Sequence, residues 1–219
     1  MTPEEKRICA HRLEQCYSGA VYDALREKGI RDCVLPPEFA PLASGRRLAG
    51  PVYAVEGERV TASDHETLLE WTGLLSKVPS GAVLMIQPND MEQAYMGELS
   101  AETLSLKGVR GAIIDGNCRD TDFIVRSGFR VFAKGKTPRD VVGTWLPRKF
   151  DAPIIMGGVT VNPGDFVVAD EDGIVIIPGG LVEEITTRAE EFLRTESLVR
   201  KAILEGEDPQ QAYIKYGKF

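Results

Sequence analysis

The sequence is poor in the residues that build zinc sites. Only two of its 219 residues are histidines, His11 and His65, and its four cysteines have no close paired spacing. A zinc site needs Cys and His ligands at short intervals, so none is expected, and we interpret the cysteines as buried free thiols. If the protein binds a metal, oxygen ligands must hold it, which points to Mg²⁺ or Mn²⁺.

Long apolar runs and an excess of positive charge are also absent. No apolar run approaches the roughly 20 residues that span a bilayer, and the first five residues, MTPEE, contain no signal core. We therefore expect a cytoplasmic protein that does not associate with membranes. The formal net charge is −7, which argues against a nucleic-acid binder, because such proteins present a basic face to the phosphates.

Three further absences narrow the function and the architecture. No Gly-x-Gly-x-x-Gly motif follows an expected strand, so a dinucleotide or methyl-donor site has no support. The segment Asp170–Gly173 resembles the start of a calcium loop, but Leu181 stands where that loop needs a glutamate, and we interpret the segment as a tight turn. Repeats and low-complexity linkers are missing, so we expect one domain over residues 1–219.

Helix and strand signals alternate along the middle of the chain. Capping boxes and stop glycines predict helices over residues 3–17, 18–28, 64–77, 97–107, 121–127 and 181–205. Short apolar runs predict strands over residues 48–55, 83–86, 112–114, 130–133, 154–161, 166–169 and 174–177. Since helices and strands alternate and strands cluster late, we expect an α/β fold with a mixed sheet.

The segment Asp115–Asp120, with the sequence DGNCRD, is the strongest candidate for a binding site. It follows a buried strand, and α/β proteins place ligands at the carboxyl ends of strands. Arg119 offers a planar fork that matches a carboxylate, and Asp120 offers hard oxygen ligands suited to Mg²⁺. The alternative is a local ion pair in which Asp120 only caps the next helix.

The helix start at Gly97-Glu98-Leu99-Ser100 is the second candidate. Free backbone N–H groups and the positive end of the helix dipole favour an anion there. Gly97 would also let a ligand approach the backbone closely. The alternative is that glycine is an ordinary helix start.

Glu196 interrupts an apolar stripe on the last predicted helix. The stripe consists of residues spaced three and four apart: Ile185, Ala189, Phe192, Val199 and Ile203. A carboxylate inside such a stripe is costly when it is buried without a partner. Glu196 therefore either lies at the stripe's edge and reaches solvent, or faces a polar site such as one on another subunit.

Several segments, taken together, resemble the family of 4-hydroxy-4-methyl-2-oxoglutarate aldolases, which also contains the regulators of ribonuclease E activity. They are Gly97–Leu99, Gly108–Gly111, Asp115–Asp120 and Phe132–Gly135, within a resemblance that extends from Asp23–Leu25 through Leu48–Pro51 to Asp172–Pro178. The resemblance implies an α-β-β-α sandwich with a core similar to a swivelling β/β/α domain. It also implies homotrimers or hexamers with active sites between subunits, and residues 181–219 packing at the subunit interface.

The resemblance implies a role for each candidate residue. The aspartate matching Asp120 holds a divalent metal, largely through waters, and the arginine matching Arg119 binds the pyruvyl group and stabilises its enolate. The backbone at Gly97, Leu99 and Ser100 holds the pyruvate carboxylate. Glu98, and Glu196 from a neighbouring subunit, order the waters of the metal. The aldolases have Asp and Leu where this chain has Glu98 and Ser100, which makes this pocket more polar.

The expected function is that of a metal-dependent lyase. It would cleave a 4-hydroxy-2-oxo acid, such as 4-hydroxy-4-methyl-2-oxoglutarate or 4-carboxy-4-hydroxy-2-oxoadipate, to pyruvate, with Mg²⁺ or Mn²⁺ as cofactor and oxaloacetate decarboxylation as a second activity. The alternative is a non-catalytic, protein-binding regulator of RNA processing. The long C-terminal tail favours the enzyme, because the regulators tend to end earlier.

Overall fold

One long strand, β2 (Leu48–Arg59), connects the two layers of the sheet. Its first four residues pair antiparallel with β9 (Phe166–Ala169). The next five pair in parallel with β3 (Val83–Gln87), and its last residues pair antiparallel with β6 (Trp145–Phe150). The strand order is β1-β5-β4-β3-β2-β9-β10, with β6 also on β2. The predicted mixed sheet is therefore confirmed.

The computed structural model describes residues 1–219. Its helices are α1 (Pro3–Gln15), α2 (Ser18–Glu27), α3 (Asp64–Lys77), α4 (Glu98–Leu106), α5 (Thr121–Ser127), α6 (Val182–Leu204) and α7 (Pro209–Tyr216), with a 3-10 turn at Gly179–Leu181. The remaining strands are β1 (Ala40–Pro41), β4 (Gly111–Cys118), β5 (Arg130–Lys136), β7 (Ile154–Met156), β8 (Val159–Val161) and β10 (Ile174–Ile177).

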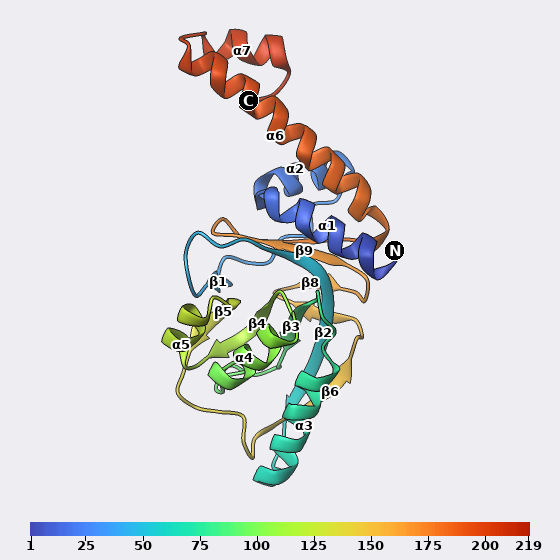
Figure 1. The fold of residues 1–219 in the computed structure, drawn as a ribbon, viewed down its shortest axis with the longest axis vertical. Coiled ribbons are helices and arrows are strands. Elements are labelled where there is room, and N and C mark those ends of the chain that lie inside the picture. The colour runs from blue at the N-terminus through green and yellow to red at the C-terminus, as the bar shows by residue number, and fades with distance from the viewer.

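Three apolar clusters divide the molecule into four layers (Figure 1). Alternate residues of β9 and β10, such as Val168 and Val175, pack under α1, α2 and α6. The residues between them, such as Val167 and Ile176, face β3 and β4 across a middle cluster. The outer side of β3–β5 packs against α3, α4 and α5. Because side chains alternate across each strand, the result is the expected α-β-β-α sandwich.

The structure corrects several predicted elements. The predicted strand over residues 154–161 is a hairpin of β7 and β8, because Gly157 and Gly158 adopt positive φ values of 54° and 85° and turn the chain. Strand β4 extends to Cys118, beyond the predicted residue 114. Strands β1 and β6 and helix α7 were not predicted. Strand β6 carries Pro147 and two basic residues, so it lacks the apolar run of a buried strand.

The C-terminal helices form an arm that leaves the body of the molecule (Figure 1). Helix α6 packs on α2 through its first half and then projects outward, where α7 folds back onto it. The arm exposes the apolar residues Leu198, Leu204, Tyr213, Ile214 and Phe219. The four cysteines are free and buried, as predicted. None of the helices is both long enough and apolar enough to cross a membrane.

Of the two glycines in β2, Gly57 has less space for a side chain. A Cβ at this position would lie 1.9 Å from a ring carbon of the buried Trp145. We predict that Gly57→Ala lowers the free energy of unfolding by about 1–3 kcal/mol, because the indole must move. Urea denaturation followed by tryptophan fluorescence measures this change.

Gly73 provides the matched control, because a Cβ there would meet nothing within 4 Å in the middle of α3. Gly73→Ala should instead raise stability by about 0.5–1 kcal/mol, since alanine is the better helix former. Equal effects of the two substitutions would contradict the packing argument.

Candidate functional site

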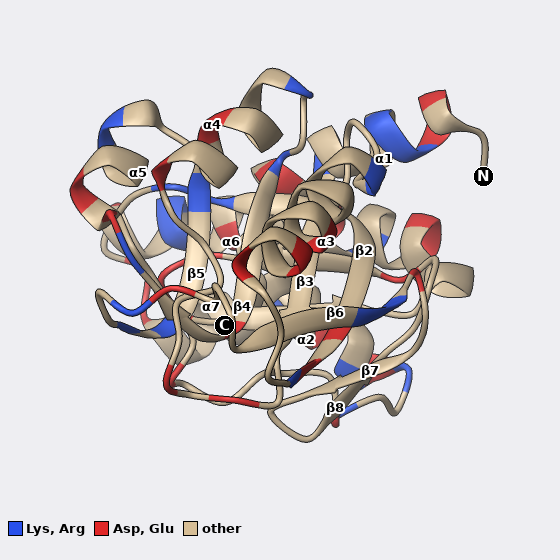
Figure 2. Cartoon of the chain, turned by 90° about the horizontal axis from the view of Figure 1, so that it is seen from below, with Lys and Arg blue, Asp and Glu red and all other residues tan.

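A cleft of about 250 Å³ lies at the beginning of α4. It is slightly smaller than the roughly 300–1,000 Å³ of most ligand pockets, which suits a small acid. Figure 2 shows α3, α4 and α5 on one face of the strands β3–β5, where the cleft is found. The lining residues are Leu68, Trp71, Ala94, Met96, Gly97, Glu98, Leu99, Ser100, Arg119, Asp120, Asp140, Val141 and Val142.

A short contact joins the two predicted candidate segments. The backbone N–H of Glu98 donates to Oδ2 of Asp120 at 3.2 Å. A Cβ at residue 97 would lie 2.8 Å from the same oxygen, so a larger residue there would push the carboxylate out of this contact. Asp120 sits at the N-cap position of α5 but makes no capping hydrogen bond. The capping alternative is therefore wrong for Asp120.

The Asp120 backbone is in the left-handed region, with φ 53° and ψ 34°. This conformation costs a non-glycine residue about 1 kcal/mol or more, and such strain often accompanies functional sites. It turns the chain directly after β4, so that the carboxylate points back toward α4. Position 120 therefore combines an unusual backbone with a side chain that faces the cleft.

Arg119 lies between two carboxylates. Its Nε is 3.5 Å from Oδ2 of Asp120, and its Nη1 is 3.3 Å from Oδ2 of Asp140. Its backbone N–H donates to the carbonyl of Met96, which holds the residue at the cleft. Asp140 is the site residue that the sequence analysis missed. It comes from a loop 21 residues further along the chain and belongs to no recognisable motif.

The first turn of α4 supplies two backbone donors that are still free. The first intrahelical bond runs from the N–H of Ala101 to the carbonyl of Gly97, and no hydrogen bond uses the N–H of Leu99 or Ser100. Both groups lie at the positive end of the helix dipole. The residues that line the cleft therefore include one arginine and two unpaired backbone amides, and their use by an anion stays a prediction.

Ser100 makes the cleft less polar than the sequence analysis expected. The hydroxyl is buried and accepts a hydrogen bond of 3.0 Å from the indole N–H of Trp71. Trp71 also packs edge-to-face on Trp145, at 6.0 Å between ring centroids. Trp145 in turn packs on Tyr95 at 5.2 Å. Trp71 is thus a fixed wall of the cleft, a role that the sequence analysis did not assign.

Asp90 fixes the loop that leads to Gly97. Its carboxylate accepts hydrogen bonds from the Tyr95 hydroxyl and from the backbone N–H groups of Glu92 and Gln93. Burial acts to raise the pKa of Asp90, but these hydrogen bonds outweigh it and lower the pKa below its usual range. Burial raises the pKa of Tyr95, so its hydroxyl stays protonated and remains a donor.

The donor set of the cleft fits a hydrated magnesium ion better than zinc. No three His, Cys, Asp or Glu side chains lie close enough together to hold a metal ion by themselves. Oδ1 of Asp120 has no hydrogen-bond partner, and the Glu98 carboxylate also makes no hydrogen bond. Mg²⁺ commonly takes one or two carboxylates and keeps several waters. Asp120, with Glu98 nearby, could hold such an ion.

Glu196 does not lie in this cleft. It is on α6, where its carboxylate accepts a hydrogen bond from the Tyr17 hydroxyl and lies 3.7 Å from Nζ of Lys218. Burial, followed by the hydrogen bond to Glu196, raises the pKa of Tyr17 above its usual range, so Tyr17 remains the donor. Within its own chain Glu196 thus faces two polar partners, and its expected role at the site of a neighbouring subunit stays a prediction.

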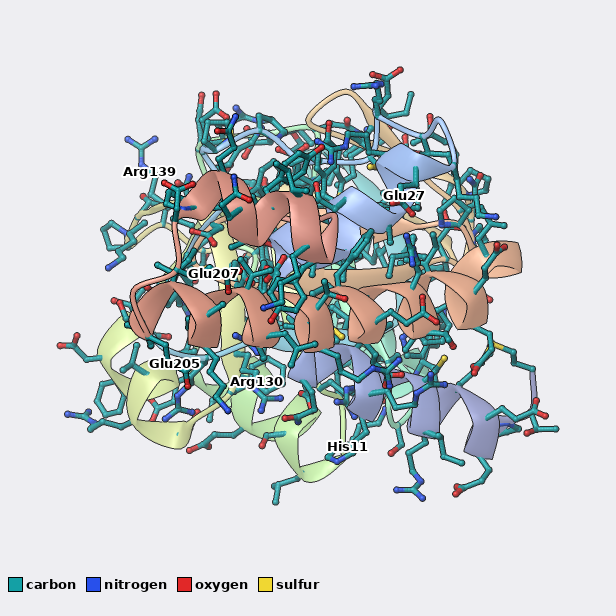
Figure 3. All side chains as sticks on the ribbon, turned by 90° about the horizontal axis from the view of Figure 1, so that it is seen from above. His11, Glu27, Arg130, Arg139, Glu205 and Glu207 are labelled. Carbon is teal, nitrogen blue, oxygen red and sulfur yellow. The ribbon has the colours of Figure 1, made fainter.

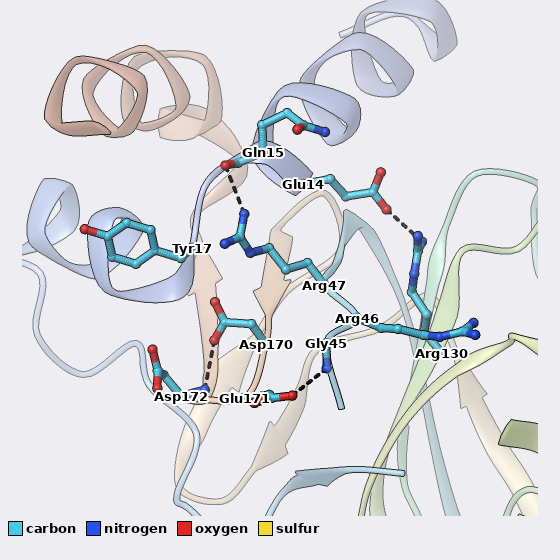
Figure 4. Close-up of a pocket in the computed structure, with 10 residues that line it drawn as sticks. All are labelled: Glu14, Gln15, Tyr17, Gly45, Arg46, Arg47, Arg130, Asp170, Glu171 and Asp172. Atoms are coloured by element: carbon cyan, nitrogen blue, oxygen red, sulfur yellow. Dashed lines mark hydrogen bonds and ion pairs between the residues drawn. The ribbon is translucent and has the colours of Figure 1, made fainter. Parts of the chain in front are cut away.

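A second, wider hollow of about 650 Å³ contains none of the predicted residues (Figure 4). Several of its charged groups are paired within the chain: Arg130 pairs with Glu14 at 2.7 Å, and Glu171 accepts from the N–H of Gly45. Asp170 accepts two hydrogen bonds from Ser18, at the turn between β9 and β10. That turn confirms the tight-turn interpretation.

Comparison with known proteins agrees with the geometry of the cleft. The model of the RraA-like family, described as Aldolase/RraA, matches residues 18–176. The chain belongs to this family. The match includes Gly97, Glu98, Arg119 and Asp120, and ends before α6 and Glu196.

Two relatives of this Aldolase/RraA chain illustrate the range of its similarity. Protein DlpA of Legionella pneumophila is 27% identical in an alignment 226 positions long, which covers 98% of this chain and 36% of DlpA. The chain thus spans about a third of DlpA. A Halalkalibacterium halodurans protein with the provisional name 4-hydroxy-4-methyl-2-oxoglutarate aldolase is 25% identical over 83% of each chain.

A solved structure shows the same fold. RraAS2 of Streptomyces coelicolor, described as an unusual member of the RNase ES inhibitor RraA protein family, superposes with a TM-score of 0.78 and 27% identity. The alignment covers 91% of this chain and 97% of RraAS2. The family of this chain therefore includes proteins named for catalysis and proteins named for inhibition of RNA processing.

Two substitutions of Asp120 separate the effect of its strained backbone from the effect of losing its carboxylate. Asp120→Gly and Asp120→Ala both remove the carboxylate, but only alanine keeps the left-handed strain. We predict that the glycine variant is more stable than the alanine variant by about 1 kcal/mol. Thermal or urea unfolding of the two variants measures the difference, and equal stabilities would show that the loop relaxes.

Proposed function

We propose that this protein is a divalent-metal-dependent lyase that cleaves a 4-hydroxy-2-oxo acid to pyruvate. The observation that carries the proposal is the convergence of the Arg119 guanidinium, the Asp120 carboxylate and the free amides of Leu99 and Ser100 in one cleft. This set suits a 2-oxo carboxylate, because its carboxylate and its C2 oxygen, where negative charge develops, need separate hydrogen-bond donors. The aldolase name of a relative supports the same reaction class.

In the proposed reaction, the α4 amides bind the substrate and Arg119 stabilises the negative charge that develops on it. The two amides of α4 bind the carboxylate of the pyruvyl end, aided by the helix dipole. Arg119 donates to the oxygen at C2, where negative charge develops as the reaction proceeds. Asp120 and Asp140 hold the guanidinium in this position from two sides.

In the proposed reaction, the 4-hydroxyl loses its proton and its electron pair forms the new C4 carbonyl. The C3–C4 bond breaks, and its electrons give the pyruvate enolate, which is then protonated at C3. Glu98, whose carboxylate makes no hydrogen bond of its own, is placed to order the water that takes the hydroxyl proton. Oxaloacetate would form the same enolate when its C3–C4 bond breaks and carbon dioxide leaves.

Asp120 would hold the metal, with Glu98 near its waters. When bound, Mg²⁺ or Mn²⁺ would withdraw electron density from the keto acid and so lower the energy of the enolate. Oδ1 of Asp120, which has no hydrogen-bond partner, would be the oxygen that holds the ion.

A non-catalytic regulator of RNA processing is the second candidate. The close superposition on RraAS2 favours it, because that protein is named for its family of RNase inhibitors. Turnover separates the two proposals. A lyase releases pyruvate from oxaloacetate at a rate that depends on a carboxylate in the cleft, whereas a non-catalytic regulator does not.

Asp120→Ala tests the proposed function directly. We predict that Mg²⁺-dependent release of pyruvate from oxaloacetate and from 4-hydroxy-2-oxo acids falls at least a hundredfold, with the fold intact by circular dichroism. The assay couples pyruvate to lactate dehydrogenase. Asp122→Ala is the matched control, because Asp122 is on the first turn of α5 and does not line the cleft. Unchanged turnover in Asp120→Ala, or none in the wild type, would refute the lyase.

We further propose that the protein forms a cyclic oligomer in which Glu196 completes a neighbouring subunit's cleft. The exposed apolar side chains of the arm support a role in assembly. In this arrangement Tyr17 and Lys218 hold the carboxylate of Glu196 in a fixed position on its own subunit.

Mixed oligomers test this arrangement. Glu196→Gln should lower turnover while assembly survives. Subunits with Asp120→Ala mixed with subunits with Glu196→Gln should recover part of the activity, because some clefts then receive both intact residues. Light scattering confirms the assembly. An active monomer, or no recovery in verified mixed oligomers, would contradict a shared site.

A further inference from the structure

The cleft has more negative than positive side chains, and this balance affects which substrates it can bind. Three carboxylates line it, those of Glu98, Asp120 and Asp140, and Arg119 is the single cation among the lining residues. Arg119 is already within 3.5 Å of two of these carboxylates. The cleft therefore has one guanidinium and two free amides for anions, which is enough for one pyruvyl group.

The wall away from these donors is apolar. Helix α3 contributes Leu68 and Trp71, and the loop before β6 contributes Val141 and Val142. Leu99, at the start of α4, is 77% exposed, and Leu68 is 50% exposed. Trp71 is held by Ser100 and Trp145, so it cannot turn away to make space for water. These side chains surround the space that the part of a substrate beyond C3 would enter.

The chain brings no further cation to this wall. Helix α3 has no Lys or Arg before Lys77, which lies over the ring of Phe150. Arg139 is next to Asp140 in sequence, but its guanidinium is 3.8 Å from Glu92, and Figure 3 shows it projecting from the surface. A carboxylate placed against the wall would thus meet apolar groups and like charges, which is costly without a partner.

We propose that the preferred substrate is a 4-hydroxy-2-oxo monocarboxylic acid with an apolar group on C4. This inference rests on the proposed lyase function and narrows its substrate class. The pyruvyl end occupies Arg119 and the α4 amides, and the apolar group packs against Leu68, Trp71 and Leu99. Cleavage releases pyruvate and an apolar aldehyde or ketone, so the second product carries no charge. A dicarboxylate such as 4-hydroxy-4-methyl-2-oxoglutarate places its second carboxylate on this wall.

The test compares kcat/KM for two probes on the full-length protein with Mg²⁺. The probes are 4-hydroxy-2-oxohexanoate and 4-hydroxy-4-methyl-2-oxoglutarate, with pyruvate release as the readout and oxaloacetate as a reference. We expect the monocarboxylate to be preferred at least tenfold. Equal use of the two probes, or preference for the dicarboxylate, would overturn the inference while leaving the lyase in place. No pyruvate from any of the three would refute the lyase and this inference with it.

A pair of neighbouring leucines provides the matched variants. Leu68→Arg adds a cation to the apolar wall and should shift the kcat/KM ratio about tenfold toward the dicarboxylate. Leu69→Arg adds the same charge one residue further along α3, on a side chain that is 60% exposed and does not line the cleft, and should leave the ratio unchanged. The same shift of the kcat/KM ratio in both variants, or in neither, would show that this wall does not discriminate between substituents on C4.

Discussion

The contact between Asp120 and the first turn of α4 is the constraint on which the candidate site depends. Strands β3 and β4 are parallel neighbours, so the segments that follow them emerge at the same edge of the sheet. Gly97 lets the Asp120 carboxylate reach the N–H of Glu98, and the left-handed backbone of Asp120 turns the side chain toward it. A side chain at residue 97 would displace the Asp120 carboxylate from this contact.

The surrounding groups serve to hold this arrangement. Asp90 anchors the loop before Gly97, and the rings of Tyr95, Trp145 and Trp71 pack edge-to-face in a row from the core to the cleft. Asp140 closes on Arg119 from the other side. Because these partners are already in place, little reorganisation is needed when an anion binds, and such preorganised groups stabilise developing charge more strongly than solvent does.

The cleft and the C-terminal arm lie in different parts of the molecule. The family match covers residues 18–176, which include the cleft and exclude the arm. Glu196 illustrates the separation, since its partners Tyr17 and Lys218 are near the arm and far along the chain from the cleft. The cleft of one subunit thus lies in the body, whereas in the proposed oligomer α6 supplies Glu196 to a neighbour and the arm's exposed apolar side chains serve assembly.

Sequence alone determined the elements with strong local signals. The capping box at Thr2 and Glu5 fixed the start of α1, and the apolar runs located β3, β9 and β10. The α/β class followed from the order of these elements. The motif residues Gly97, Glu98, Arg119 and Asp120 were also identified, and the structure brings them together, because neighbouring parallel strands must end at one edge. Tertiary structure alone decided the rest. Asp140, Trp71 and the partners of Glu196 come from segments distant in sequence, and no local pattern encodes a contact made only when loops and helices pack.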